Sequence, residues 1–128
     1  MKLSAKPALL AALMLAALST GANASAKDGD VIVRGACSGA STFKLKVNQP
    51  RNGMVETEFE VDQNVNRVLW RVTLTDNTTT FFSGSVRTKA PSGSFRVAAS
   101  TPDQPGTDTI RARATSPSGE VCSASASV

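Results

Sequence analysis

The stretch from Val55 to Leu74 constrains the fold more than any other part of the chain. Its first half alternates apolar and acidic side chains, and its second half alternates apolar side chains with polar or charged ones. A period of two is typical of a β-strand with one face buried and the other in water. The sequence therefore predicts two strands. Their inward residues are Val55, Thr57, Phe59 and Val61, then Val68, Trp70, Val72 and Leu74.

We expect these two strands to pair as an antiparallel hairpin closed by residues 63–66. In this register Phe59 faces Trp70 on the buried side, and Glu58 faces Arg71 on the wet side. Both apolar sets then lie together, whereas a slip of one residue would expose one of them. The aromatic pair should contribute roughly 0.5–1 kcal/mol beyond plain burial.

A turn at Asp76-Asn77-Thr78 predicts a third strand in the same sheet. Asx side chains bond their own backbone, and Asn tolerates a positive φ angle. A three-residue loop would place Gly84 opposite Trp70, where the missing side chain leaves room for the indole.

Short apolar alternations recur through the rest of the chain, with turn signals at steps of roughly 8–12 residues. The turn signals are clusters of Gly, Pro, Asn and Ser, and no stretch after residue 26 has helical periodicity of useful length. This spacing predicts an all-β fold, an immunoglobulin-like antiparallel β-sandwich of about seven or eight strands. The further strands are expected near Val31–Val33, Phe43–Val47, Phe95–Ala99, Ile110–Ala114 and Val121–Val128.

The first 26 residues predict a secretory signal peptide. A basic head at Lys2 and Lys6 precedes an apolar run, and the small residues that follow fit cleavage after Ala24 or Ala26. The apolar run is shorter than the roughly 20 residues that span a bilayer. Residues 27–128 are therefore expected to form one secreted, extracellular domain with no membrane span.

Two cysteines, Cys37 and Cys122, remain in this domain. An even count in an oxidising compartment predicts one disulfide, which would tie the region after the first strand to the last strand. The chain-entropy argument gives roughly 4–5 kcal/mol of stabilisation for a loop of this length. A pair of free reactive thiols is the alternative interpretation.

The chain contains no His and no Tyr. This excludes His-based general bases, Ser-His-Asp triads and His-ligated zinc. The formal net charge is +4, and the predicted signal peptide holds two of the 14 basic residues. No Lys/Arg cluster lies beside an aromatic platform, so nucleic-acid binding is not indicated. We expect no catalytic residue, no cofactor and no metal site.

The acidic face of the first strand is the best candidate for a functional carboxylate group. Alternate residues on one strand face lie about 7 Å apart, a spacing that suits glycoside hydrolysis. The alternative is a solvated outer face that discourages edge pairing. We favour it, because nothing on one outer face excludes water or raises a single pKa. This acidic stripe consists of Glu56, Glu58, Glu60 and Asp62.

The segment Asp62–Asn66 begins like a calcium-binding loop. Arg67, however, stands where such a loop needs Gly, and Thr73 stands where it needs a bidentate Glu. Asx residues in a turn are the plainer interpretation.

Trp70 is a candidate platform for carbohydrate stacking, but its place in the inward set predicts a core residue instead. Leu69, Phe81 and the Pro-rich loops are better candidates for a contact surface, because they fall on the outer face or at loop tips.

Short motifs are spread over nearly all of residues 27–128. They are Cys37-Ser38, Lys44-Leu45-Lys46, Glu58-Phe59-Glu60-Val61-Asp62, Trp70, Asp76-Asn77, Ser92-Gly93-Ser94-Phe95, Asp108-Thr109-Ile110-Arg111-Ala112 and Gly119-Glu120-Val121-Cys122. Together they resemble the pattern of short exported bacterial proteins of unknown function, from high-GC Gram-positive species of the actinobacterial type. The resemblance implies secretion, a β-sandwich and one disulfide, and it implies no activity.

These observations favour a secreted, non-enzymatic binding or structural module. Its target, an extracellular protein or a cell-envelope component, would meet the loops or the outer face of a sheet. The alternative is a secreted protease inhibitor that presents Ser100–Gly106 as an exposed loop stiffened by proline, because pre-ordering a loop favours tight binding. An enzyme is the third interpretation and the least supported.

Overall fold

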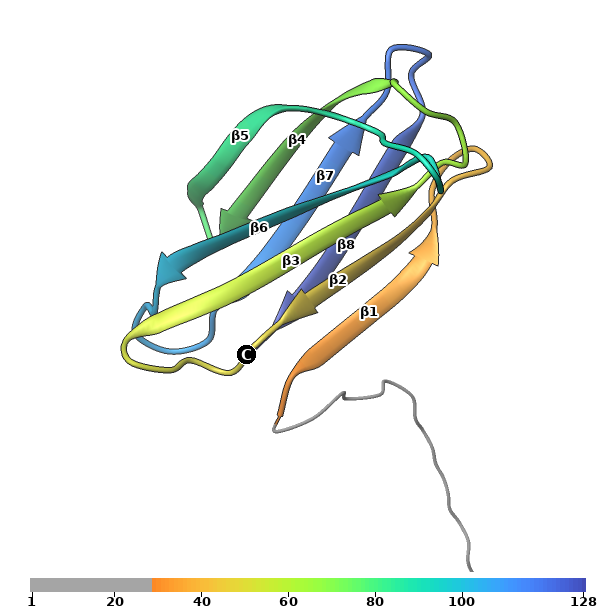
Figure 1. Ribbon diagram of the computed structural model, residues 1–128. Coiled ribbons are helices and arrows are strands. Elements are labelled where there is room, and N and C mark those ends of the chain that lie inside the picture. The colour runs from red at the N-terminus through yellow and green to blue at the C-terminus, as the bar shows by residue number, and fades with distance from the viewer. Residues whose placement is uncertain (1–28) are drawn as a thin grey trace, which may run out of the picture.

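The computed structural model describes residues 29–128, which form two packed antiparallel sheets of four strands each (Figure 1). Sheet A has the strand order β1-β2-β3-β6, and sheet B has the order β5-β4-β7-β8. The strands are β1 (Val31–Ala36), β2 (Thr42–Val47), β3 (Met54–Asp62), β4 (Leu69–Asp76), β5 (Thr79–Arg87), β6 (Ser94–Pro102), β7 (Thr109–Thr115) and β8 (Val121–Ser127). The predicted all-β sandwich is thus confirmed.

The predicted signal peptide and its cleavage sites lie outside the described residues. Among residues 29–128 there is no helix of the length and apolar character that a membrane span requires.

The core lies between the two sheets and is filled by the inward residues of both. Trp70, Phe59 and Leu45 are its largest fully buried side chains. The Trp70 ring centroid lies 6.0 Å from that of Phe95, and indole Nε1 donates a hydrogen bond of 3.0 Å to Gln63 Oε1. The prediction that Trp70 is a core residue is confirmed.

The predicted hairpin between β3 and β4 is wrong, because these two strands lie in different sheets (Figure 1). Phe59 pairs within sheet A, and Trp70 pairs within sheet B. The connection between them contains positive φ angles at Asn64 and Arg67, and it carries the chain from one layer to the other. The two inward sets face the same core, but from opposite sides of it rather than along one ladder.

The third predicted strand does pair with the second, but in a different register. Gly84 faces Val72, and Val86 takes the place opposite Trp70. The turn after β4 is of the expected kind, since Asn77 has a φ angle of 55°. The register shifts between Leu74 and Thr75, and this β-bulge is a local detail that alternation alone does not reveal.

The predicted disulfide joins Cys37, directly after β1, to Cys122 in β8. Beside it the Glu120 carboxylate accepts bonds from the backbone N–H of Gly39 and of Ser41, at 3.1 and 2.8 Å, and from the Ser41 hydroxyl at 3.0 Å. The loop between β1 and β2 is therefore held to sheet B by one covalent bond and several hydrogen bonds. A disulfide is compatible with an extracellular location.

Candidate functional site

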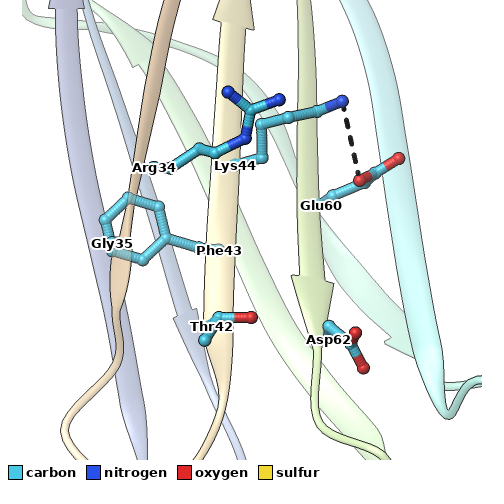
Figure 2. A pocket seen from close by; sticks show the side chains of 7 residues that line it. All are labelled: Arg34, Gly35, Thr42, Phe43, Lys44, Glu60 and Asp62. Atoms are coloured by element: carbon cyan, nitrogen blue, oxygen red, sulfur yellow. Dashed lines mark ion pairs between the residues drawn. The ribbon is translucent and has the colours of Figure 1, made fainter.

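The outer face of sheet A carries charges of both signs, and these pair with one another. Lys44 Nζ lies 3.9 Å from Glu60 Oε1 (Figure 2), and Arg96 Nη1 lies 3.1 Å from Glu58 Oε1. The predicted pair between Glu58 and Arg71 is wrong, because Arg71 belongs to the other sheet. The charges of this face therefore largely neutralise each other.

The acidic stripe lies on β3, whose neighbours in sheet A are β2 and β6. Glu58 is opposite Lys46, and Glu60 is opposite both Lys44 and Arg96. The interpretation that the stripe protects a sheet edge is wrong, because β3 has a partner on each side. Its carboxylates instead alternate with cations across the strands, as favourable cross-strand pairs do.

An open hollow of about 470 Å³ lies on the β1-β2-β3 part of sheet A (Figure 2). A Cβ at Gly35 would lie 2.7 Å from Phe43 Cζ, so the ring covers this edge-strand glycine. The strand β1 continues through Gly35 to Ala36, beyond the expected strand near Val31–Val33. The lining contains two cations and two carboxylates, so it offers no surplus charge to a ligand. Its residues are Arg34, Gly35, Thr42, Phe43, Lys44, Glu60 and Asp62.

The outer face of sheet B is different, because its charged residues are all arginines. Ser and Thr hydroxyls surround them, and the one acidic residue of these four strands, Asp76, is fully buried in the interior. Among residues 29–128 none of the four guanidinium groups forms an ion pair. The arginines are Arg71 on β4, Arg87 on β5, and Arg111 and Arg113 on β7, all exposed.

These four residues form a diagonal across sheet B, which we call the arginine line. Arg87 faces the residue two positions before Arg71 on the neighbouring strand. Arg71 faces the residue two positions after Arg113 on the next strand, and Arg111 continues along that strand. Diagonal neighbours on one sheet face lie about 7–8 Å apart, and alternate residues along a strand lie about 7 Å apart. The line therefore advances in three nearly equal steps.

Two hollows lie along the arginine line. The first, of about 380 Å³, opens over β4, β7 and β8, and its lining is Thr73, Thr75, Arg111, Ala112, Arg113 and Ser123. The second, of about 510 Å³, lies at the Arg87 end, and its lining is Asn66, Arg67, Arg87, Thr88, Lys89 and Ala90. Neither lining contains a carboxylate, so two further cations extend the positive surface beyond Arg87.

A separate buried acidic pair lies where the turn after β4 meets the loop between β6 and β7. No backbone or side-chain N–H group of the described residues donates a hydrogen bond to either carboxyl oxygen of Asp76. Burial raises the pKa of Asp76 to about 7, and the adjoining Asp108 carboxyl adds to the increase. Burial also acts to raise the pKa of Asp108, but hydrogen bonds from Asp76 and from the Gln104 backbone N–H outweigh it and lower that pKa.

No group of His, Cys, Asp and Glu in the described part of the chain is arranged to hold a metal ion. The segment that begins like a calcium loop serves the turn after β3 instead. Its backbone N–H groups at Gln63 and Asn64 donate to the Gly93 carbonyl at 3.0 and 3.1 Å. Asn64 has a φ angle of 64°, which fits the Asx-turn interpretation.

The residues expected on a contact surface are not all exposed in the structure. Leu69 is 41% exposed and lies directly opposite Arg87, so it borders the arginine line. Phe81 is partly buried against the core cluster, and its expected exposure is wrong. The segment Ser100–Gly106 is only partly a loop, because β6 continues to Pro102.

Sequence reasoning missed the arginine line, because its members are far apart in the chain. Alternation places Arg71, Arg111 and Arg113 on outward faces, which was the available signal. The pairing of β5 with β4, and of β4 with β7, was needed to bring the four residues together. The expectation that the domain has no Lys/Arg cluster holds along the sequence and fails on the surface of sheet B.

No protein-family model matches the chain, and neither a curated protein nor a solved structure matches it. An argument about function therefore rests on the chemistry of the site itself.

Proposed function

We propose that the chain is an exported, non-enzymatic binding module that holds an anionic extracellular or cell-envelope partner on the outer face of sheet B. The observation that carries this proposal is the arginine line, four exposed guanidinium groups with no ion-pair partner among residues 29–128. The guanidinium group is planar and binds carboxylate or phosphate through two parallel hydrogen bonds. Sheet A has no comparable excess of positive charge, because its Lys and Arg side chains face the carboxylates of the same sheet.

Two further observations support an exported binding role. The disulfide between Cys37 and Cys122 suits an oxidising compartment, as do the signal peptide predicted from residues 1–26 and the resemblance to exported bacterial proteins. The open outer face of a sheet suits binding better than catalysis, because it leaves bound groups in contact with water.

The proposal is tested by the binding of the exported protein to immobilised polyphosphate, polygalacturonate and dextran sulfate, with neutral dextran as the reference. Binding should be confined to the anionic polymers and should weaken as salt is added. Replacing two members of the arginine line, Arg111→Gln with Arg113→Gln, should weaken binding at least about tenfold, since charge-assisted bonds contribute about 1.5–3 kcal/mol each.

The matched control removes the same charge from sheet A through Arg34→Gln with Arg96→Gln. We expect a change of less than about threefold, because exposed ion pairs such as that of Arg96 contribute about 0–1 kcal/mol. Equal losses in the two variants would mean that binding follows net charge alone, and the proposed face would then be wrong.

The protease inhibitor is the competing proposal, and one feature favours it. The loop after β6 is ordered by side-chain amides: Asn77 Nδ2 donates to Gln104 Oε1 at 3.0 Å, and Gln104 Nε2 donates to the Asp76 carbonyl at 3.3 Å. Incubation with secreted serine proteases and metalloproteases tests this reading. Absence of both inhibition and cleavage within Ser100–Gly106 rejects it.

A further inference from the structure

We infer that the partner is a linear polymer of polyol units joined by phosphodiesters, which lies along the arginine line with one phosphate at each arginine. This inference rests on the proposed function and makes it more specific. The polymer would run diagonally from Arg111 through Arg113 and Arg71 to Arg87. Its end would enter the hollow where Arg67 and Lys89 join Arg87.

The even spacing of the line indicates a linear partner with regularly repeated charges. Its steps are about 7–8 Å on the diagonal and about 7 Å along β7. A phosphodiester chain with a three-carbon polyol between phosphates repeats at roughly 7 Å when extended, by ordinary bond lengths. Successive phosphates therefore match successive arginines, whereas a compact anion would reach only one or two of them.

The groups beside the line indicate a polyol rather than a nucleic acid. Single-stranded nucleic acids are usually held by aromatic side chains on which their bases stack. The paired outward residues of sheet B beside the line are Ser, Thr, Leu69 and Val121, with no aromatic ring among them. The hydroxyls of Thr73, Thr75 and Ser123, which line the first hollow, match the hydroxyls of a polyol.

The hollow at the Arg87 end would bind the terminal phosphate of the polymer. Arg67 and Lys89 lie in the segments that flank β4 and β5, and with Arg87 they place three cations around about 510 Å³ of space. The Arg87 guanidinium also donates to the Arg67 carbonyl at 3.4 Å, which links these two residues. A terminal phosphate monoester carries more negative charge than a diester, so it fits the most cationic part of the surface.

The first experiment titrates the exported protein with glycerol-phosphate oligomers of increasing length by isothermal calorimetry. Affinity should rise with each added phosphate until the line is covered, at about four to five phosphates, and should then level off. The slope of log K against log salt should become steeper with each phosphate bound, by no more than about 0.7 per phosphate. Affinity that keeps rising with length, or that is already maximal for a single glycerol phosphate, would overturn the one-to-one register.

The second experiment moves one arginine without changing the charge of the face. Arg71→Thr with Ser83→Arg takes a cation from the middle of the line to an exposed position on β5 that neighbours none of the other three arginines. Affinity for a five-phosphate oligomer should fall at least about tenfold. Without Arg71, Arg87 and Arg113 are separated by two strand spacings across the sheet and by four residues along it, which is more than one repeat of the polymer. Unchanged affinity, in a variant whose melting temperature matches the parent, would show that only total charge matters.

The terminal hollow has its own test. Lys89→Gln should weaken binding of oligomers that end in a phosphate monoester by about three- to tenfold, and binding of end-blocked oligomers by less than about twofold. Equal effects on the two sets of oligomers would remove the terminus from the proposal.

Two competitors, polygalacturonate and oligothymidylate, separate failure of this inference from failure of the proposed function. If polygalacturonate binds through Arg111 and Arg113 while the polyol phosphate does not, the anion-binding module stands and the phosphodiester partner is wrong. If oligothymidylate binds as tightly as the polyol phosphate, the choice of a polyol is wrong. If no anionic polymer binds, both proposals are rejected.

Discussion

Single residues of this chain differ in how far the sequence alone reveals their role. Trp70 was placed correctly, because alternation with its neighbours assigns it to the inward face whichever strand lies beside it. For Gly93 the sequence indicates at most a turn residue, because the atoms that it contacts belong to a segment remote in the sequence. A Cβ at this position would overlap the backbone N of Val65 and lie 2.6 Å from the carbonyl carbon of Asn64.

Gly93→Ala is therefore expected to cost about 2–4 kcal/mol of the free energy of unfolding, through a positive φ angle of 66° and a backbone clash together. Gly106→Ala is the control, since it has a φ angle of 77° and open space around it. It should cost only about 1–2 kcal/mol. Urea unfolding of both variants measures the difference, and equal costs would show that the loop at Asn64 gives way.

Trp70→Ala should cost about 3–5 kcal/mol, because the cavity beside Phe95 cannot collapse fully. Leu69→Ala, at the adjacent outward position, should cost less than about 1 kcal/mol. The parent protein should show blue-shifted tryptophan fluorescence that acrylamide quenches poorly. Emission like that of free indole in water would contradict the burial of Trp70.

At the scale of elements, the sequence predicted most strands and their inward faces but not their partners. The period of two belongs to each strand alone, so the alternation in the sequence of β7 matches its alternation of buried and exposed residues. The choice of partner depends on the connection. The segment after β3 has the length of a hairpin turn, yet with positive φ angles at Asn64 and Arg67 it crosses between the sheets.

The turn after β4 should make stability depend on pH. The pKa of Asp76 is about 7 in the folded chain against an ordinary value of 3.8, so the unfolded chain releases this proton first as pH rises. The free energy of unfolding should therefore fall between about pH 4 and pH 7 and then level off. The lowered pKa of Asp108 affects the free energy of unfolding in the opposite sense. The stabilisation that ionised Asp108 contributes is lost only as pH falls below about 3.8, the ordinary pKa of an Asp carboxyl.

Asp76→Asn replaces the titrating carboxyl by an amide that can donate to Asp108, so it should remove most of the decrease between pH 4 and pH 7 and leave only the smaller part that comes from the raised pKa of Asp103. Asp62→Asn, at the exposed end of β3, should leave that decrease in place. Thermal unfolding across this pH range checks both, and a decrease that persists in the Asp76 variant would place its origin elsewhere.

Loss of the disulfide should weaken, but not abolish, the attachment of the loop between β1 and β2 to β8. Reduction should lower the free energy of unfolding by a few kcal/mol, with roughly 4–5 kcal/mol as the limit from chain entropy. The hydrogen bonds of Glu120 to Gly39 and Ser41 remain, so Glu120→Ala should lower stability further in the reduced protein. Two thiols that titrate in the native protein would mean that Cys37 and Cys122 are not bridged in it.

At the scale of the whole molecule, the two outer faces differ in charge. Sheet A holds cations and carboxylates in comparable numbers on adjacent strands, and sheet B holds arginines without carboxylates. The candidate site could not be predicted from the sequence, because a surface is defined by strand order. The order β5-β4-β7 brings together residues from both halves of the chain.

Adding the protein to vesicles or beads coated with polyol phosphate should move their zeta potential from strongly negative toward zero and hold it there. The plateau follows because the exposed side of the bound layer carries balanced charge. The variant Arg111→Gln with Arg113→Gln should need at least about tenfold more protein to reach the same potential. A reversal to strongly positive potential would mean that the molecules bind in random orientation.

The pairing of charges on sheet A then has a consequence for any surface that the protein covers. Equal numbers of fixed positive and negative groups a few ångströms apart hold water firmly and attract neither anions nor cations. A layer of these domains, each with sheet B turned inward, would replace a charged polymer exterior by a hydrated, electrically neutral coat. Such a coat resists the adhesion of other macromolecules.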